Sequence, residues 1–211
     1  MDGVLISVNP FILGQIPFER TERAVKISRE VFGANAIVYQ ETFYRQFRKL
    51  KINGTLPFEQ YLRKEPSGLA YTELLPMGRA VESLAYLYKK YPAKQFFGKS
   101  CEEELTRGWH VHIDNYCNYM RGYCAGISLG DGRELGSLCR GIDLNERPIL
   151  EALVTDLSRL LEFAVTKFDY KERLQGYVSK CHLCIDVRRY IAQQTDEFEE
   201  LRPRELYYHI G

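Results

Sequence analysis

Ser179-Lys180-Cys181-His182-Leu183-Cys184-Ile185-Asp186-Val187-Arg188-Arg189-Tyr190 is the stretch around which the second half of the chain is expected to be organised. Its two cysteines lie three residues apart at the start of a segment with apolar periodicity. Both thiols would therefore occupy the first turn of a helix, where the helix dipole favours the thiolate form. This arrangement is typical of a soft-metal site. Two thiolates do not complete a four-ligand site, so further ligands are expected from elsewhere in the chain.

Four other cysteines precede this stretch, and four of the six are predicted to share one metal site. The earlier ones are Cys101, Cys117, Cys124 and Cys139. The alternative is that all six are scattered, buried cysteines. The N-terminal residues 1–4 lack the basic and apolar regions of a signal peptide, so a reducing cytoplasm is expected. In that compartment metal ligation is favoured over disulfides.

The composition is that of an ordinary water-soluble domain protein. The chain has 211 residues, 45% of them hydrophobic, with 29 basic and 28 acidic side chains. This length accommodates one domain or two small ones. The net charge of +1 and the absence of a basic run argue against nucleic-acid binding. No apolar run reaches the roughly 20 residues that a membrane span needs.

The N-terminal part is expected to form a βαβ unit over residues 4–40. Residues 4–8 form a nearly continuous β-branched and aliphatic run, which predicts a strand buried on both faces of a parallel sheet. Residues 18–32 predict an amphipathic helix that ends at Gly33. Residues 36–39 predict the second, parallel strand. The residues expected to face inward on the helix are Ala24, Ile27, Val31 and Phe32.

Further helices are expected over residues 41–50, after Pro57, and after a loop at residues 76–79. Their apolar and aromatic residues recur at helical spacing, and we interpret them as packing residues rather than as a substrate site. From residue 93 onward the sequence becomes richer in glycine, cysteine and aromatic residues. We therefore expect a domain boundary between residues 95 and 96.

The second domain is expected to combine a strand with long helices. Residues 109–114 alternate so that His110, His112 and Asp114 share one face of a strand. Pro148 begins the longest predicted helix, which runs to Phe168 and forms the scaffold of this domain.

Two sets of residues resemble the C-terminal half to two-thirds of a radical SAM protein with a SPASM- or twitch-like auxiliary domain. The first is Asp2-Gly3-Val4-Leu5-Ile6-Ser7-Val8-Asn9-Pro10-Phe11 together with Pro17-Phe18-Glu19-Arg20. The second is the ordered series Cys101, His112-Ile113-Asp114, Cys124 and Cys181-x-x-Cys184. The resemblance covers most of the chain. It implies an α/β fold, in which an incomplete TIM-like parallel β/α barrel over residues 1–95 is followed by an α+β auxiliary iron-sulfur domain over residues 96–211.

The resemblance also implies a cofactor and partners. Members of this family bind S-adenosylmethionine at a C-x-x-x-C-x-x-C cluster, and this chain has no such motif. S-adenosylmethionine is therefore expected only if an upstream polypeptide supplies that N-terminal half, which would also pair with the strand at residues 4–8. The chain is then part of a radical SAM enzyme, not active alone, that works with an electron donor.

The implied metal ligands are Cys101, Cys124, Cys181 and Cys184, which would fully ligate one four-iron four-sulfur cluster for electron transfer or substrate positioning. If one of them is not a ligand, an open iron could coordinate substrate, or His182 or Cys117 could substitute. Cys117 and Cys139 otherwise fit the family pattern poorly. Two alternatives remain: the same thiols could bind structural zinc, or His110, His112 and Asp114 could form a catalytic metal site.

Overall fold

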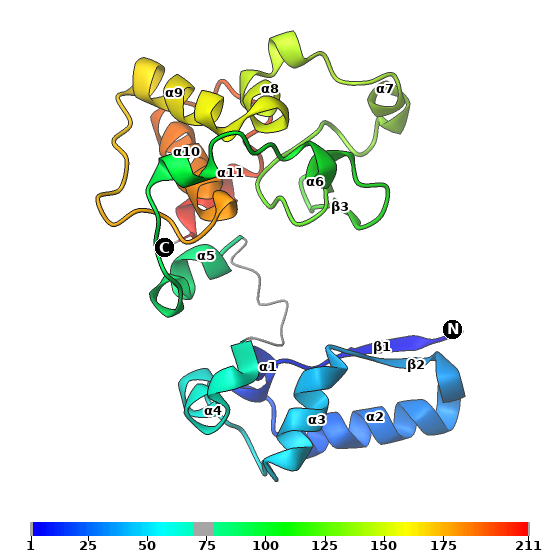
Figure 1. The fold of residues 1–211 in the computed structure, drawn as a ribbon. Coiled ribbons are helices and arrows are strands. Elements are labelled where there is room, and N and C mark those ends of the chain that lie inside the picture. Colours follow the sequence, from blue (N-terminus) through cyan, green and yellow to red (C-terminus); the bar gives the residue numbers. More distant parts are fainter. Residues whose placement is uncertain (1, 70–77, 211) are drawn as a thin grey trace. The chain divides into compact units, whose positions relative to one another are not determined.

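The computed structural model describes residues 2–69 and 78–210, and the chain divides into two units, Met1–Leu75 and Pro76–Gly211. The colours of Figure 1 run from blue to cyan in unit 1 and from green to red in unit 2. The division falls earlier than the boundary expected after residue 95. The reason is that Tyr91 forms an antiparallel bridge with Tyr177 and Val81 packs with Ile185. Residues 76 and 77 of the expected loop lie outside the described residues.

Unit 1 contains the predicted βαβ unit. Strands β1 and β2 pair in parallel, in a register that runs from Val4 opposite Ala36 to Ser7 opposite Tyr39. The main elements of the unit are β1 (Val4–Ser7), α1 (Pro10–Leu13), α2 (Phe18–Phe32), β2 (Ala36–Tyr39), α3 (Glu41–Lys49) and α4 (Phe58–Lys64). The predicted helix and both predicted strands are confirmed to within a residue or two.

The predicted burial in unit 1 is partly wrong. Strand β1 is not buried on both faces, because Leu5 and Ile37 are 57% and 56% exposed on the uncovered face of the two-stranded sheet. Helix α2 buries Phe18 and Val25, whereas Ile27 and Val31 are exposed. These two buried residues lie seven positions apart and form a different stripe from the one predicted.

The core of unit 1 is aromatic, and it accounts for the orientation of α2. The ring of Phe18 meets the ring of Phe47 edge to face at 5.5 Å, and Tyr61 packs edge to face on Phe47 and Phe43. The buried Tyr61 hydroxyl donates to Gln46 Oε1 at 2.6 Å. Helices α3 and α4 are therefore packing elements, as predicted.

Unit 2 is mainly helical, with a second two-stranded sheet in which β3 and β4 run antiparallel. The whole chain is thus a mixed α/β structure. Within the described ranges, no helix is long and apolar enough to cross a membrane. The main elements are α5 (Ala80–Ser83), α6 (Glu102–Thr106), β3 (Val111–Ile113), β4 (Tyr119–Arg121), α7 (Leu135–Cys139), α8 (Pro148–Thr155), α9 (Leu157–Phe168), α10 (Lys180–Gln194) and α11 (Arg204–Tyr208).

The single long helix predicted from Pro148 to Phe168 is wrong, because the chain breaks at Asp156. This residue is extended, with φ −162°, and its side chain accepts from the Ser158 N–H as the N-cap of α9. The same carboxylate also accepts from the Gly98 N–H at 3.0 Å. Aspartate at an N-cap satisfies amides that a helix start leaves unpaired, so the break is stabilised from both sides.

Helix α10 begins as predicted and is buried on almost every side. The Ser179 hydroxyl caps it by accepting from the His182 N–H at 3.1 Å. Leu183, Val187 and Ile191 have no exposed surface and join the main core with residues of α8 and α9. Because α10 is enclosed in this way, its orientation about its own axis is fixed.

A buried polar network fixes the face of α10 that carries Asp186. Asp186 accepts from the Arg173 guanidinium and, through Oδ2, from the Tyr170 hydroxyl at 2.5 Å. Arg173 also forms a two-pronged ion pair with Glu82, with distances of 2.5 and 3.2 Å. The His182 ring, 3.6 Å from Glu82 through Nε2, together with Arg173 lowers the pKa of Glu82 to about 2. The network ties α5 and the 173 loop to α10.

We expect Glu82→Gln to destabilise unit 2 by about 3 kcal/mol near neutral pH, because the pKa of Glu82 falls from 4.5 to about 2 on folding. A lowered folded-state pKa gives stability that is present above the unfolded pKa. That stability is lost as the pH falls from about 4.5 towards 2. Urea unfolding at pH 7 and pH 3, followed by the fluorescence of Trp109, the single tryptophan, measures it.

Glu162→Gln, at an exposed position of α9, is the matched control and should leave both curves unchanged. The role assigned to the network would be contradicted if Glu82→Gln unfolded at the same urea concentration as the unsubstituted protein at pH 7.

Candidate metal centre

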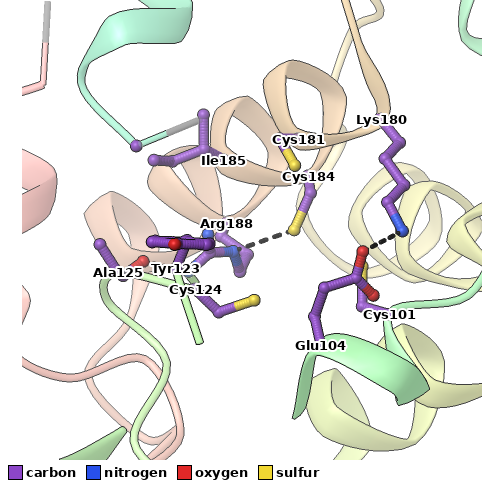
Figure 2. A pocket seen from close by; sticks show the side chains of 11 residues that line it. Cys101, Glu104, Tyr123, Cys124, Ala125, Lys180, Cys181, Cys184, Ile185 and Arg188 are labelled. Atoms are coloured by element: carbon purple, nitrogen blue, oxygen red, sulfur yellow. Dashed lines mark hydrogen bonds and ion pairs between the residues drawn. The ribbon is translucent and has the colours of Figure 1, made fainter. Parts of the chain in front are cut away.

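Five residues of α10 line one pocket, which Figure 2 shows from close by: Lys180, Cys181, Cys184, Ile185 and Arg188. Cys181, Cys184 and Arg188 follow one another at spacings of three and four residues, which places them on one side of a helix. In Figure 2, the Cys184 sulfur points into the space between α10 and the segments opposite. Residues 182, 186 and 189 occupy the neighbouring face, where the buried network holds them.

The structure brings Cys101 and Cys124 to the same pocket from two other segments. Cys101 is the N-cap residue of α6, and its N–H donates to the Leu153 carbonyl of α8 at 2.7 Å. Cys124 follows β4 in the loop that ends at Gly126. All four predicted ligands therefore line one pocket. The centres of water-sized molecules fit into about 30 Å³ of it, which exceeds the roughly 10–15 Å³ that one water needs.

Two basic side chains lie at the pocket, and their surroundings differ. Lys180 Nζ lies 2.8 Å from Glu104 Oε1 and donates to the Ser100 carbonyl at 3.0 Å. Arg188 is 4% exposed, and its Nε donates to the Cys184 sulfur at 3.2 Å. The Lys180–Glu104 and Arg188–Cys184 contacts are drawn as dashed lines in Figure 2.

Burial disfavours the charged form of the Cys101, Cys124 and Cys181 thiols when no metal is bound. Burial, followed by repulsion from Cys184, raises the pKa of Cys181 to about 12 and that of Cys124 to about 11. The same two causes raise the pKa of Cys101. The three thiols are therefore protonated near neutral pH. Metal ions reverse this preference, because their positive charge deprotonates a coordinating thiol.

The other candidate ligands named from the sequence lie away from this pocket. Cys117 lies in the turn between β3 and β4 with φ +65°, and Cys139 is exposed at the end of α7. The His182 ring is fully buried in the network, where its Nδ1 accepts from the Val178 N–H at 3.2 Å. None of the three residues lines the cysteine pocket.

Of the alternative set, His110 and His112 lie side by side, with their ring centroids 4.7 Å apart, whereas the Asp114 carboxylate is engaged in the hairpin turn. His110 precedes β3 with φ +66°, so the strict alternation of a strand does not extend to it. The Asp114 carboxylate accepts from the N–H groups of Tyr116 and Asn118 at 2.9 and 2.8 Å and thereby closes the hairpin turn. More generally, no three His, Cys, Asp or Glu side chains within residues 2–69 and 78–210 are arranged to hold a single metal ion.

Sequence reasoning missed Arg188 and Tyr207 as residues of the site. Arg188 Nη1 donates to the Ala125 carbonyl at 3.1 Å and to the Tyr207 hydroxyl at 2.6 Å. The spacing of Arg188 from Cys184, one helical turn, was the available signal. No comparable signal connects Tyr207 of α11 with the loop at residues 124–126.

The chain was compared with protein-family models, with curated proteins and with solved structures, and none of the three comparisons found a match.

Proposed function

We propose that unit 2 binds one four-iron four-sulfur cluster through Cys101, Cys124, Cys181 and Cys184 and serves as an auxiliary cluster domain like those of radical SAM proteins. The observation that carries the proposal is the meeting of these four thiols in one pocket. They come from three segments that are far apart in the sequence. Scattered buried cysteines have no reason to share a pocket.

The cluster and a single zinc ion would require different spacings of the four thiol sulfurs. Tetrahedral zinc with Zn–S distances of about 2.3 Å would hold its thiol sulfurs roughly 3.8 Å apart. No group arranged for one ion is found in the described part of the chain. A cluster keeps its cysteine ligands further apart, because iron and sulfide lie between them. Metal and sulfide analysis of the purified protein distinguishes the cluster from the zinc alternative.

The residues of the chain would each contribute to holding the cluster. Cys181 is the second residue of the 15-residue helix α10 and so lies in its first turn, where the helix dipole favours anionic sulfur. Cys184 lies three residues further along the same side of the helix. Cys101 and Cys124 line the opposite side of the pocket. A fully cysteine-ligated cluster supplies one-electron transfer and leaves no open iron for substrate. An electron donor is therefore the expected partner.

For unit 1 we propose that the βαβ unit belongs to an incomplete TIM-like β/α barrel. Two observations support this: the strands pair in parallel, and the sheet carries apolar side chains on its uncovered face, with Leu5 and Ile37 more than half exposed. Further strands from an upstream polypeptide would extend this two-stranded sheet and cover these apolar side chains. That polypeptide would also supply the S-adenosylmethionine cluster.

After anaerobic reconstitution, we expect about four irons and four sulfides per chain. Replacing Cys101, Cys124, Cys181 or Cys184 singly with alanine should lower both contents markedly, because each removes one ligand. Iron and sulfide analysis of the purified variants measures this. Cys117→Ala and Cys139→Ala are matched controls that should keep the full contents. Stoichiometric zinc without sulfide, or full iron in Cys181→Ala, would contradict the proposal.

We also expect that the isolated chain does not cleave S-adenosylmethionine. Cleavage needs an iron that is free to bind the amino and carboxylate groups of the substrate, and four cysteines leave none. The assay measures 5′-deoxyadenosine after the reconstituted protein is mixed with S-adenosylmethionine and dithionite. Formation of 5′-deoxyadenosine in proportion to protein concentration would contradict full ligation by four cysteines.

A further inference from the structure

Arg188 is a buried cation, and none of the residues that the structure describes places an anionic side chain beside it. Its guanidinium donates to three acceptors, the Cys184 sulfur, the Ala125 carbonyl and the Tyr207 hydroxyl. Over the described ranges, no carboxylate forms an ion pair with it. A charge taken out of water is costly unless an opposite charge lies nearby. A negative charge bound at the pocket would therefore stabilise the buried guanidinium of Arg188.

The other charged side chains at the pocket do not neutralise Arg188. Glu104 is already paired with Lys180 at 2.8 Å, so together these two side chains add no net charge. The remaining groups that face Arg188 are thiols, the Tyr207 hydroxyl and backbone carbonyls. The missing negative charge must therefore come from the thiolates and what they bind.

The position of the guanidinium is fixed by the C-terminal helix. The Tyr207 hydroxyl accepts from Arg188 and donates to the Gly126 carbonyl, and the Tyr207 side chain is 1% exposed. Gly126 has φ +77°, and a Cβ at this position would lie 2.8 Å from the Tyr207 hydroxyl. The loop and α11 thus close over Arg188, so its Nε is directed at the Cys184 sulfur.

We propose that Arg188 is the counter-ion of the cluster and raises its reduction potential, with Tyr207 as the residue that positions it. The inference rests on the proposed cluster. Reduction adds one electron and hence one negative charge, which a nearby buried cation stabilises. The N–H bond to the Cys184 sulfur acts in the same direction, because hydrogen bonds to ligand sulfurs tune cluster potentials.

The test measures the reduction potential of the reconstituted cluster by spectroelectrochemical titration. Arg188→Gln removes the charge and should shift the potential to more negative values. Arg188→Lys keeps the charge without the guanidinium geometry and should restore part of the shift. The matched control is the double variant that combines Lys180→Gln with Glu104→Gln. It removes a whole ion pair without changing the net charge, so its reduction potential should stay close to that of the unsubstituted protein.

Tyr207→Phe provides an independent measurement if Arg188→Gln fails to assemble a cluster. It loosens the anchor but keeps the charge, so a smaller negative shift is expected. The role of Arg188 would be overturned if Arg188→Gln, with full iron and sulfide, kept the unsubstituted potential. If Arg188→Gln assembles no cluster, an unchanged potential in Tyr207→Phe with full iron and sulfide would overturn it. An equal shift in the double control variant would do the same. If the unsubstituted protein assembled no cluster, the proposed function itself would fail.

Discussion

The enclosure of helix α10 is the constraint on which unit 2 depends, because each side of this helix is fixed by a different kind of contact. Leu183, Val187 and Ile191 pack into the apolar core. Asp186 is held by Arg173 and Tyr170. With those faces fixed, the remaining face must turn towards the pocket. The two cysteines and the arginine there gain a defined direction from contacts on the opposite sides of the helix.

The pocket combines two features that are each unfavourable in the protein without metal. Burial raises the pKa of the Cys101, Cys181 and Cys124 thiols, and Arg188 is buried with no carboxylate paired to it in the described part of the chain. An anionic cluster ligated by thiolates would relieve both at once, since it needs deprotonated sulfur and offers negative charge to the guanidinium. The same physical argument connects ligand chemistry, electrostatics and redox behaviour.

Local sequence patterns predicted much of the fold. The wrong predictions occur where contacts between residues far apart in the sequence determine the structure. The helices at Phe18–Phe32 and Lys180–Gln194 follow from periodicity and capping. The break at Asp156 was missed because Gly98, far away in sequence, shares its carboxylate. The inward face of α2 was mispredicted because the position of Phe47 determines which stripe is covered.

The candidate site shows the same division. Cys181 and Cys184 could be paired from their spacing alone, whereas the inclusion of Cys101 and Cys124 depended on the resemblance of this sequence to a known family. Tyr207 lies on a five-residue helix near the C-terminus, and its contact with Arg188 follows from tertiary packing. No sequence rule relates an isolated tyrosine to a buried arginine on another helix.

Mössbauer spectroscopy of the protein reconstituted with ⁵⁷Fe tests the central claim most directly. The account predicts that all bound iron belongs to one four-iron cluster in which every iron has only sulfur ligands. Iron in mononuclear sites, or a cluster with one iron that lacks a cysteine ligand, would contradict the account.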